Sequence, residues 1–232
     1  MNNLFLKSLF AVVLLALFSA SAVAKKAALP ETTKDGLHLK HQDKLGAVYT
    51  LPGASLSAYE RIKLVDVYVA FEKNYQRDYN RDEMGIANRL TDDDMKKIKE
   101  KVASEFKRVF TKELEKGGYK VVDETGKDVM ILRPAIINLQ ITAPEIAKMN
   151  MSRTIVRSSG SLTLYMELYD SVTSQKFAEV IDAEELGNDA FSHVANQGTN
   201  LMALDETLEK WARLLRKRLD EAHKATVKTD GK

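Results

Sequence analysis

The sequence predicts an α+β fold, a two-layer sandwich in which a mostly antiparallel sheet of about five strands is covered on one face by two long helices. Short stretches of alternating apolar and polar residues recur through the middle of the chain, which is typical of strands with one buried face. Two long segments each carry a single apolar stripe at helical spacing, so each can cover the same face of a sheet. The expected element order is β-α-β-β-β-β-α.

The first 24 residues have the pattern of a secretory signal peptide. Lys7 supplies the positive charge, Leu9–Phe18 is the apolar run, and Ala22-Val23-Ala24 is a cleavage motif, so we expect cleavage after Ala24. The apolar run is shorter than the ~20 residues of a membrane-spanning helix. The chain contains no cysteine, so an apolar core must stabilise it without disulfides. These features predict an exported, periplasmic protein with no transmembrane segment after cleavage.

The charge balance of the remaining chain excludes one class of protein, and its length is that of a single domain. Without Lys7, 34 basic residues face 33 acidic ones, and this balance argues against a nucleic-acid binder. We expect residues 25–57 to form an extended or flexible lead-in, residues 58–223 a single α+β domain, and residues 224–232 a flexible tail.

The first predicted strand and helix follow one another. Tyr59–Phe71 alternates Val65, Val67 and Val69 with other side chains and predicts a strand. The segment from Thr91 to Gly118 predicts a long helix. Thr91 is a good N-cap, three acidic residues occupy the first turn, and two glycines end the helix. Its apolar stripe consists of Met95, Ile98, Val102, Phe106, Val109 and Phe110.

Four strands and a second helix complete the prediction. The strands lie in residues 120–122, Val129–Thr142, Gly160–Tyr169 and Lys176–Glu184, and Pro134 suggests an edge position or a bulge in the second of them. Between the last two, the stretch DSVTSQ after Tyr169 predicts a hairpin turn whose Asp, Ser and Thr side chains bond local backbone. The final helix covers residues 199–219, with a stripe of Leu201, Leu204, Leu208, Trp211, Leu215 and Leu219.

Several segments together resemble a known family. They are the strand Tyr59–Phe71, the acidic cap Thr91–Asp94, LRPAIINL at Leu132–Leu139, GSLTLYMELYDS at Gly160–Ser171 and WARLLRKRLD at Trp211–Asp220. Their order and spacing, over about Leu37–Ala222, resemble the domain-of-unknown-function family numbered 3313. The resemblance implies an exported envelope protein of Gram-negative bacteria, often a lipoprotein. This chain lacks the acylated cysteine, and it has Ser174 where the family often has Gly. The family has no established site residues to carry over.

Residue types with catalytic or metal-binding chemistry do not form a coherent set. His193 lies in a predicted loop without a partner motif, and His38, His41 and Asp43 provide fewer ligands than a structural zinc site uses. The acids of the first helical turn are explained by capping, and Glu184-Glu185 ends a strand without a sugar-site context. We therefore assign no catalytic, cofactor or metal residue.

The predicted contact surfaces are one sheet face and one loop. The alternation of Gly160–Tyr169 places Tyr165, Glu167 and Tyr169 on the face opposite its leucines, and residue types common at interfaces fill the loop that precedes this strand. The loop residues are Met149, Met151, Arg153 and Arg157.

We therefore expect a non-enzymatic binding or accessory module of the cell envelope, whose partner is another envelope protein. The alternatives are a hydrolase with an unrecognised site, which would need His193 near Asp or Ser, and a periplasmic carrier of lipids or small molecules. The basic residues of the last helix could contact anionic lipid or cell-wall polymer, but a solvated face explains them as well. These residues are Arg213, Arg216, Lys217 and Arg218.

Overall fold

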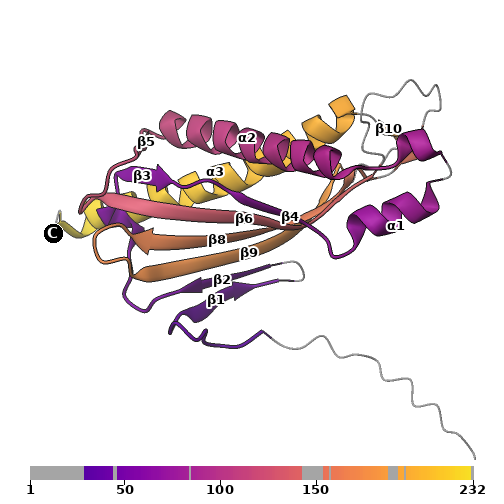
Figure 1. The fold of residues 1–232 in the computed structure, drawn as a ribbon. Helices are drawn as coiled ribbons and strands as arrows, with labels where there is room; N and C mark the ends of the chain where they lie inside the picture. The colour runs from indigo at the N-terminus through magenta and orange to yellow at the C-terminus, as the bar shows by residue number, and fades with distance from the viewer. Residues whose placement is uncertain are drawn as a thin grey trace, which may run out of the picture.

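The computed structural model describes residues 29–43, 46–83, 85–142, 154–156, 158–187, 193–195 and 197–230. The predicted signal peptide and its cleavage site lie outside these residues. Within them, one mixed sheet has eight strands in the order β1-β2-β9-β8-β6-β3-β5, with β4 also paired to β6 (Figure 1). Its strands are β1 (His38–Gln42), β2 (Gly46–Thr50), β3 (Arg61–Leu64), β4 (Tyr68–Phe71), β5 (Lys120–Val121), β6 (Val129–Ile141), β8 (Gly160–Asp170) and β9 (Lys176–Leu186).

Three α-helices are present in the described residues: α1 (Tyr75–Asp82), α2 (Asp92–Lys116) and α3 (Gln197–Asp230). The two long ones lie side by side over the sheet (Figure 1). A short two-stranded sheet pairs β7 (Thr154–Val156) with β10 (His193–Ala195). The single-turn helices η1 (Leu56–Ala58) and η2 (Ile86–Asn88) precede β3 and α2.

The core lies between the sheet and the two long helices. Alternate residues of β6 and β8 face α2 and α3, and the apolar stripes of both helices face the sheet. The buried members include Leu132, Ile136, Leu164, Met166, Phe106, Phe110, Leu208 and Trp211. The rings of Phe106 and Phe110 stack with centroids 4.0 Å apart, so the space between the layers is filled by packed side chains.

The α+β class is confirmed, but the predicted count of five strands and the predicted order are wrong. Two strands, β1 and β2, come from residues 38–50, where the sequence predicts an extended or flexible lead-in. The single strand predicted at Tyr59–Phe71 is two strands, because the chain leaves β6 between Leu64 and Tyr68. At the other end, α3 continues to Asp230, into the segment predicted to be a tail.

Pro134 explains where β3 and β4 separate. β6 is an interior strand, with β8 on one side and β3 and β4 on the other, so of the two predicted alternatives the edge position is wrong. The strand does contain a bulge, but it lies after Pro134, between Ile137 and Gln140. The backbone N–H of Val65 donates to Leu132, so every second residue of β6, including Pro134, turns its backbone towards β3 and β4. Pro134 has no N–H to donate, and it lies between the residues that pair with Leu64 and with Tyr68. The proline thus coincides with the break in this ladder.

The predicted helix cap is confirmed, and so is the hairpin turn, except that the Ser171 side chain bonds the distant backbone of Gly126 and not local backbone. Thr91 caps α2, since its side chain accepts from the backbone of Asp94 and the Asp94 carboxylate accepts from the backbone of Thr91. The turn between β8 and β9 is organised by Asp170, whose Oδ1 accepts from the backbone N–H groups of Val172 and Thr173 at 3.0 and 2.7 Å. Ser174 closes the turn in the left-handed region, with φ of 57°.

Candidate functional site

The sheet face turned away from α2 and α3 is the candidate contact surface, and we call it the outer face. Along β8, Leu162, Leu164, Met166 and Leu168 are buried against the helices, and the intervening residues are half-buried. The prediction that Tyr165, Glu167 and Tyr169 share the opposite face therefore agrees with the burial pattern of the strand. Register extends this face to the neighbouring strands, because Tyr165 pairs with Ala135 of β6 and with Ile181 of β9.

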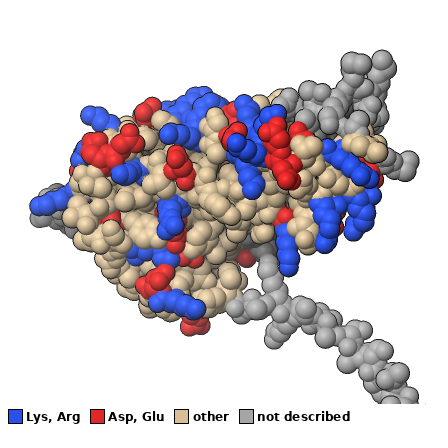
Figure 2. Space-filling model, in the orientation of Figure 1, with Lys and Arg blue, Asp and Glu red and all other residues tan. Residues whose placement is uncertain are grey.

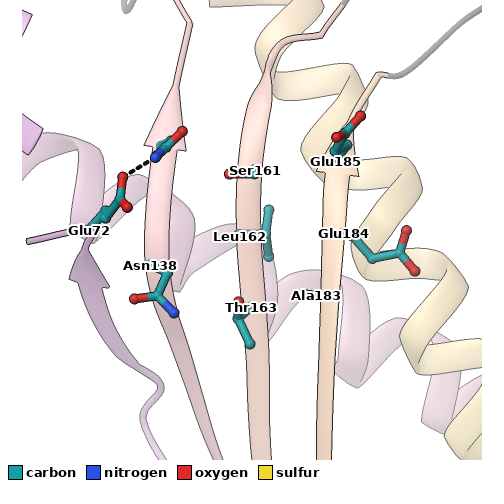
Figure 3. Close-up of a pocket in the computed structure, with 9 residues that line it drawn as sticks. Glu72, Asn138, Ser161, Leu162, Thr163, Ala183, Glu184 and Glu185 are labelled. Atoms are coloured by element: carbon teal, nitrogen blue, oxygen red, sulfur yellow. Dashed lines mark hydrogen bonds between the residues drawn. The ribbon is translucent and has the colours of Figure 1, made fainter. Parts of the chain in front are cut away.

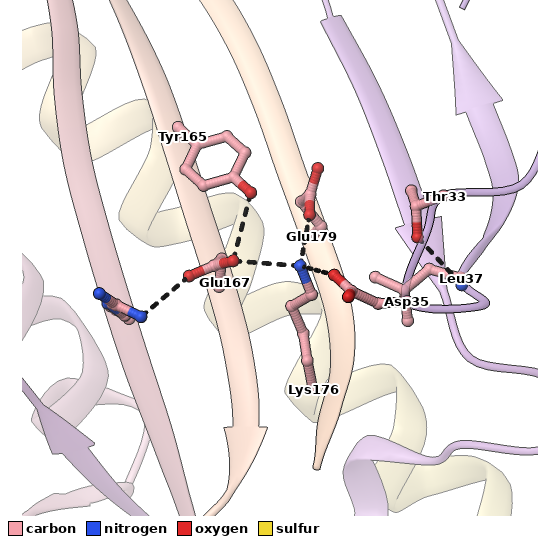
Figure 4. A network of polar contacts seen from close by, with 8 residues as sticks. Thr33, Asp35, Leu37, Tyr165, Glu167, Lys176 and Glu179 are labelled. Atoms are coloured by element: carbon pink, nitrogen blue, oxygen red, sulfur yellow. Dashed lines mark hydrogen bonds and ion pairs between the residues drawn. The ribbon is translucent and has the colours of Figure 1, made fainter. Parts of the chain in front are cut away.

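A charged cluster occupies one end of the outer face (Figure 4). The ammonium of Lys176 lies 2.5 Å from Asp35, 3.1 Å from Glu167 and 2.9 Å from Glu179. Its side chain is only 12% exposed. Burial alone lowers the pKa of Lys176, but hydrogen bonds to three carboxylates outweigh it and hold the pKa above its usual range. Lys176 is therefore a permanent cation that neutralises its neighbours.

Two of the predicted contact residues, Tyr165 and Tyr169, carry hydroxyl groups within or beside this cluster. The hydroxyl of Tyr165 lies 3.2 Å from Oε1 of Glu167. Burial, followed by the nearby carboxylate of Glu179, raises the pKa of Tyr165, and burial likewise raises the pKa of Tyr169. Both phenols stay protonated at neutral pH, which suits them to donate hydrogen bonds and makes them poor nucleophiles.

A turn near the N-terminus covers part of the outer face. In the segment Thr33–Leu37, the backbone of Thr33 donates to Leu37 and that of Gly36 donates back to Thr33. Leu37 is fully buried against Ala47 and Tyr49 of β2, which point to the outer face in register with Ile181 and Glu179. Asp35, on the same turn, reaches Lys176 (Figure 4). The chain therefore covers its own outer face over β2 and leaves the part over β4, β6 and β8 uncovered in the described residues.

The uncovered part, which we call the open outer face, has an apolar floor and polar margins. The floor consists of Ile131, Ala135, Ile137, Ile181 and Ala183, together with the hydroxyl residue Thr163, and all six are half-buried. Tyr68 of β4 pairs with Ala135 and is 66% exposed, and the side chain of Arg133 is 67% exposed. Tyrosine and arginine are enriched in protein interfaces, where they combine a broad apolar body with polar atoms.

A depression of about 620 Å³ lies at the end of the open outer face away from Lys176 (Figure 3). We call it the groove. Its walls come from Glu72, after β4, and from the ends of β6, β8 and β9. The remaining lining residues are Asn138, Gln140, Ser161, Leu162, Thr163, Ala183, Glu184 and Glu185. Most of its side chains are acids, amides or hydroxyls, so it can both donate and accept hydrogen bonds.

A bulge in β6 shapes this groove. Register with β8 passes from Ile137↔Thr163 to Gln140↔Ser161, so β6 carries an extra residue there. Asn138 adopts φ of 52°, a left-handed conformation that Asn tolerates better than most residues. The amide of Gln140 donates to the carboxylate of Glu72 (Figure 3).

The two adjacent acids of β9 do not form a catalytic pair. Glu184 and Glu185 point to opposite sides of the strand. Glu184 pairs with Lys210 of α3, while Glu185 is exposed in register with Ser161. Carboxylates on opposite faces of a sheet cannot act on the same bond of a substrate.

The other candidates identified in the sequence are dispersed. Met149, Met151, Arg153 and Arg157 lie outside the described residues, as does the side chain of His193. His41 lies 3.7 Å from Asp43 in an exposed pair, and the described residues contain no group of three or more potential metal ligands. On α3, Arg216 bonds Glu113 of α2 at 2.9 Å, and Arg213 and Arg218 pair with carboxylates on their own helix. Arg216 therefore joins the two helices.

Sequence reasoning missed the Lys176 cluster and the groove. Lys176 lies between a turn and an apolar strand, and a lysine at such a position is usually exposed to solvent. Its partner Asp35 lies in a segment predicted to be an extended or flexible lead-in. Nothing local in the sequence indicates that these residues meet.

Several solved structures are distantly similar to the chain. The chain matches a PelC dodecamer from Paraburkholderia phytofirmans with 9% identity and a TM-score of 0.34, over 70% of this chain and 96% of that one. It matches a putative neuraminyllactose-binding hemagglutinin homolog from Helicobacter pylori with 12% identity and a TM-score of 0.35, over 72% and 89%. A PDZ domain protein from Parabacteroides distasonis gives 9% identity and a TM-score of 0.37, over 73% and 34%. At such TM-scores, these similarities imply nothing about what this chain binds.

Sequence comparison is more informative. The family model described as "Protein of unknown function (DUF3313)" matches residues 33–215. No curated protein gives a significant match. In the described part of the chain, no helix has both the length and the apolar character needed to cross a membrane.

Proposed function

The chain belongs to the DUF3313 family, and from that premise we propose that it is a non-enzymatic binding or accessory module of the bacterial cell envelope, which contacts another envelope protein through its open outer face. The signal-peptide pattern of residues 1–24 supports export to the periplasm. The proposal treats the fold as a two-layer sandwich, with a helical layer that stabilises the sheet and a sheet face that meets the partner.

The observation that carries the proposal is the composition of the open outer face. A sheet exposed to water on one side usually places charged and hydroxylated residues there. Here Ala135, Ile137 and Ile181 lie together in the middle of the face, with Tyr68 and Arg133 exposed beside them. An apolar centre with Tyr and Arg around it is the usual composition of an interface that is buried in a complex.

The packing of the interior favours this function over transport of lipids. A carrier needs an apolar cavity, and the natural place in this fold is between the sheet and the helices. That space is occupied by Phe106, Phe110 and Trp211, which are all buried. The groove lies on the outside of the sheet and is lined mostly by polar side chains, which suits a polar partner better than a lipid tail.

Site-specific photo-crosslinking in living cells tests the proposal. A photoreactive amino acid is placed at Thr163, on the open outer face, and at Ser104, on the exposed side of α2 as the matched control. We expect a discrete adduct with one other envelope protein from position 163 and none from position 104. No adduct from position 163, or equal adducts from both positions, would refute the proposed surface.

A further inference from the structure

One side of β4 is an unpaired edge of the sheet. β4 pairs with β6 alone, and the N–H of Glu72, which follows β4, donates to Leu139 of β6. The backbone groups of successive residues in a strand alternate in direction. Those of Ala70 therefore face β6, while the N–H and C=O groups of Val69 and Phe71 face away from it. Among the described residues, no backbone group bonds Val69 or Phe71 on that side.

The neighbouring part of the same edge is already completed by a strand. β5 pairs in parallel with β3, and the N–H of Val122 donates to Ile62. The chain then turns back towards the start of β3, where Arg61 bonds Glu124 and Asp128 at 2.7 Å each. β5 therefore ends before it reaches β4, and the place beside β4 in line with β5 holds no strand of the described residues.

The opposite edge of the sheet, β1, carries features that usually prevent pairing with another chain. The N–H of Leu39 donates to Glu31, the ladder with β2 has a bulge between Leu39 and His41, and the exposed residues include Lys40. In the described part of the chain, β4 has none of these features. Its four residues are uncharged, and the extra residue at its irregular register belongs to β6. Of the two edges, β4 is therefore the one suited to accept a further strand.

Helix α2 extends over the helical side of this edge. Val69 is buried, and Phe71 is half-buried against the core on the same side of the strand. Nζ of Lys99, from α2, lies 5.9 Å from the centre of the Phe71 ring, and the adjacent Ile98 is half-buried. Figure 2 shows few charged side chains along the strip below α2 where Figure 1 places β4. A strand added beside β4 would therefore bring its inward side chains next to Phe71, where aliphatic groups fit best.

We propose that the free edge of β4 accepts an extended segment of the partner protein as an additional strand, with aliphatic side chains turned towards α2 and an acidic one beside Lys99. In the described residues, no carboxylate pairs with the ammonium of Lys99, which lies over Phe71. Backbone hydrogen bonds to Val69 and Phe71 supply affinity, and the side chains that face α2 supply selectivity. A second copy of this chain is disfavoured, because pairing β4 with β4 would bring the two Lys99 side chains close together. The inference rests on the function proposed above for the existence of a protein partner, and it adds how that partner binds.

Amide hydrogen exchange followed by NMR, with and without a defined peptide, tests the proposal. The probe is the heptapeptide Glu-Thr-Val-Thr-Val-Thr-Glu, blocked at both ends. Its acids and valines share one side, and either strand direction places an acid near Lys99. We expect the peptide to slow the amide exchange of Val69 and Phe71 by about tenfold or more, because their N–H groups gain partners. Exchange at Ala70, whose N–H already faces β6, should change little.

Methylation of the peptide's backbone nitrogens distinguishes strand pairing from side-chain contact alone. Directly opposite residues of paired strands turn their side chains to the same side. The valine N–H groups therefore face β4 in antiparallel pairing, and the threonine N–H groups face it in parallel pairing. Methylating one of these two sets should abolish binding, and methylating the other should leave binding nearly unchanged. Equal effects of the two sets would overturn the inference.

A charge variant and its matched control test the acidic side chain. Lys99→Gln should weaken peptide binding about two- to fivefold, as expected for an exposed ion pair. Lys112→Gln, at an exposed position further along α2, should bind the peptide like the unmodified protein. Equal binding by the two variants would overturn the assigned acidic side chain, and no binding of the peptide by the unmodified protein would overturn the added strand.

Two further outcomes separate this inference from its alternatives. Slowed exchange of Val69 and Phe71 that increases with protein concentration in the absence of peptide would assign the edge to a second copy and overturn the inference. The adduct expected from position 163 comes from β8, in the middle of the open outer face, and does not require the edge of β4. Its presence together with a failed peptide titration would retain the proposed function and remove only the added strand.

Discussion

Nζ of Lys176 lies 2.5 Å from Oδ2 of Asp35, an ion pair that joins the N-terminal turn to the outer face of the sheet. The same ammonium bonds Glu167 and Glu179 from neighbouring strands. Because the lysine is almost buried, the two half-buried or buried acids depend on it most: Glu179 for its ion pair, and Glu167 together with the more distant Arg133 at 3.7 Å. Lys176 thereby links β8, β9 and the segment before β1 through one group.

Replacing this lysine should therefore destabilise the fold well beyond a surface substitution. Lys176→Met leaves Glu167 and Glu179 facing one another, and we expect it to lower the free energy of unfolding by about 2–3 kcal/mol. Lys112→Met, on the exposed side of α2, should stay within about 0.5 kcal/mol of the unmodified protein. Urea denaturation of both variants at pH 7 measures the difference, and equal stabilities would show that the cluster is dispensable.

Removing the charge of Asp35 should lower the free energy of unfolding less than removing the charge of Lys176. The side chain of Asp35 is 56% exposed, so its ion pair is screened by solvent. We expect Asp35→Asn to lower the free energy of unfolding by less than about 1 kcal/mol. A loss as large as that of Lys176→Met, measured in the same denaturation series, would mean that the N-terminal turn contributes far more than its exposure indicates.

The pair of Asp182 and Trp211 predicts an unusual pH dependence. Burial raises the pKa of Asp182, and the Trp211 indole N–H, which donates at 2.7 Å, offsets this only in part. A carboxyl with a raised folded-state pKa favours folding at low pH and opposes it once pH passes the unfolded-state value near 4. Asp182→Asn keeps an acceptor for Trp211 without the charge, so it should raise the free energy of unfolding at pH 7, by up to about 1 kcal/mol.

The increase in the free energy of unfolding expected for Asp182→Asn should disappear near pH 3, where the carboxyl of Asp182 is protonated in both the folded and the unfolded chain. Asp123→Asn, in the exposed turn after β5, is the control and should show little difference between the two pH values. Thermal or urea unfolding of the three proteins at pH 3 and pH 7 distinguishes the cases. Destabilisation by Asp182→Asn at pH 7 would indicate that the negative charge itself, through Lys210, stabilises the fold.

Ser174 offers a test of local backbone strain. Its φ of 57° is a conformation that glycine adopts without the steric penalty of a side chain. Ser174→Gly should therefore stabilise the hairpin by up to about 1 kcal/mol. The neighbouring Gln175→Gly should destabilise it, because Gln175 has ordinary negative φ and glycine adds freedom to the unfolded chain. The ranking of the two variants in thermal unfolding is the measurement, and the reverse ranking would contradict it.

The features that could be predicted from sequence are those specified within a few residues. The Thr91 cap and the alternation of Leu162–Leu168 each depend on neighbours along the chain, and both appear as predicted. The division of Tyr59–Phe71 into two strands depends instead on Pro134, which lies in another strand and lacks the N–H to continue the ladder. Likewise, β1 and β2 are only five residues long and gain their stability from β9 and from Leu37, which their own sequences do not reveal. Long-range pairing, which has no local signature, accounts for these misses.

Tyr68 provides the most direct test of the open outer face. Because its side chain is two-thirds exposed, Tyr68→Ser should change the free energy of unfolding by no more than about 0.5 kcal/mol. An aromatic side chain that an interface buries can contribute about 2 kcal/mol or more, so the same substitution should strongly reduce the adduct formed from position 163. Leu214→Ser is the control, as Leu214 is an exposed apolar residue on α3, away from the sheet face. Equal adduct yields from the two variants would place the partner elsewhere on the molecule, whereas loss only with Tyr68→Ser would assign the contact to the open outer face.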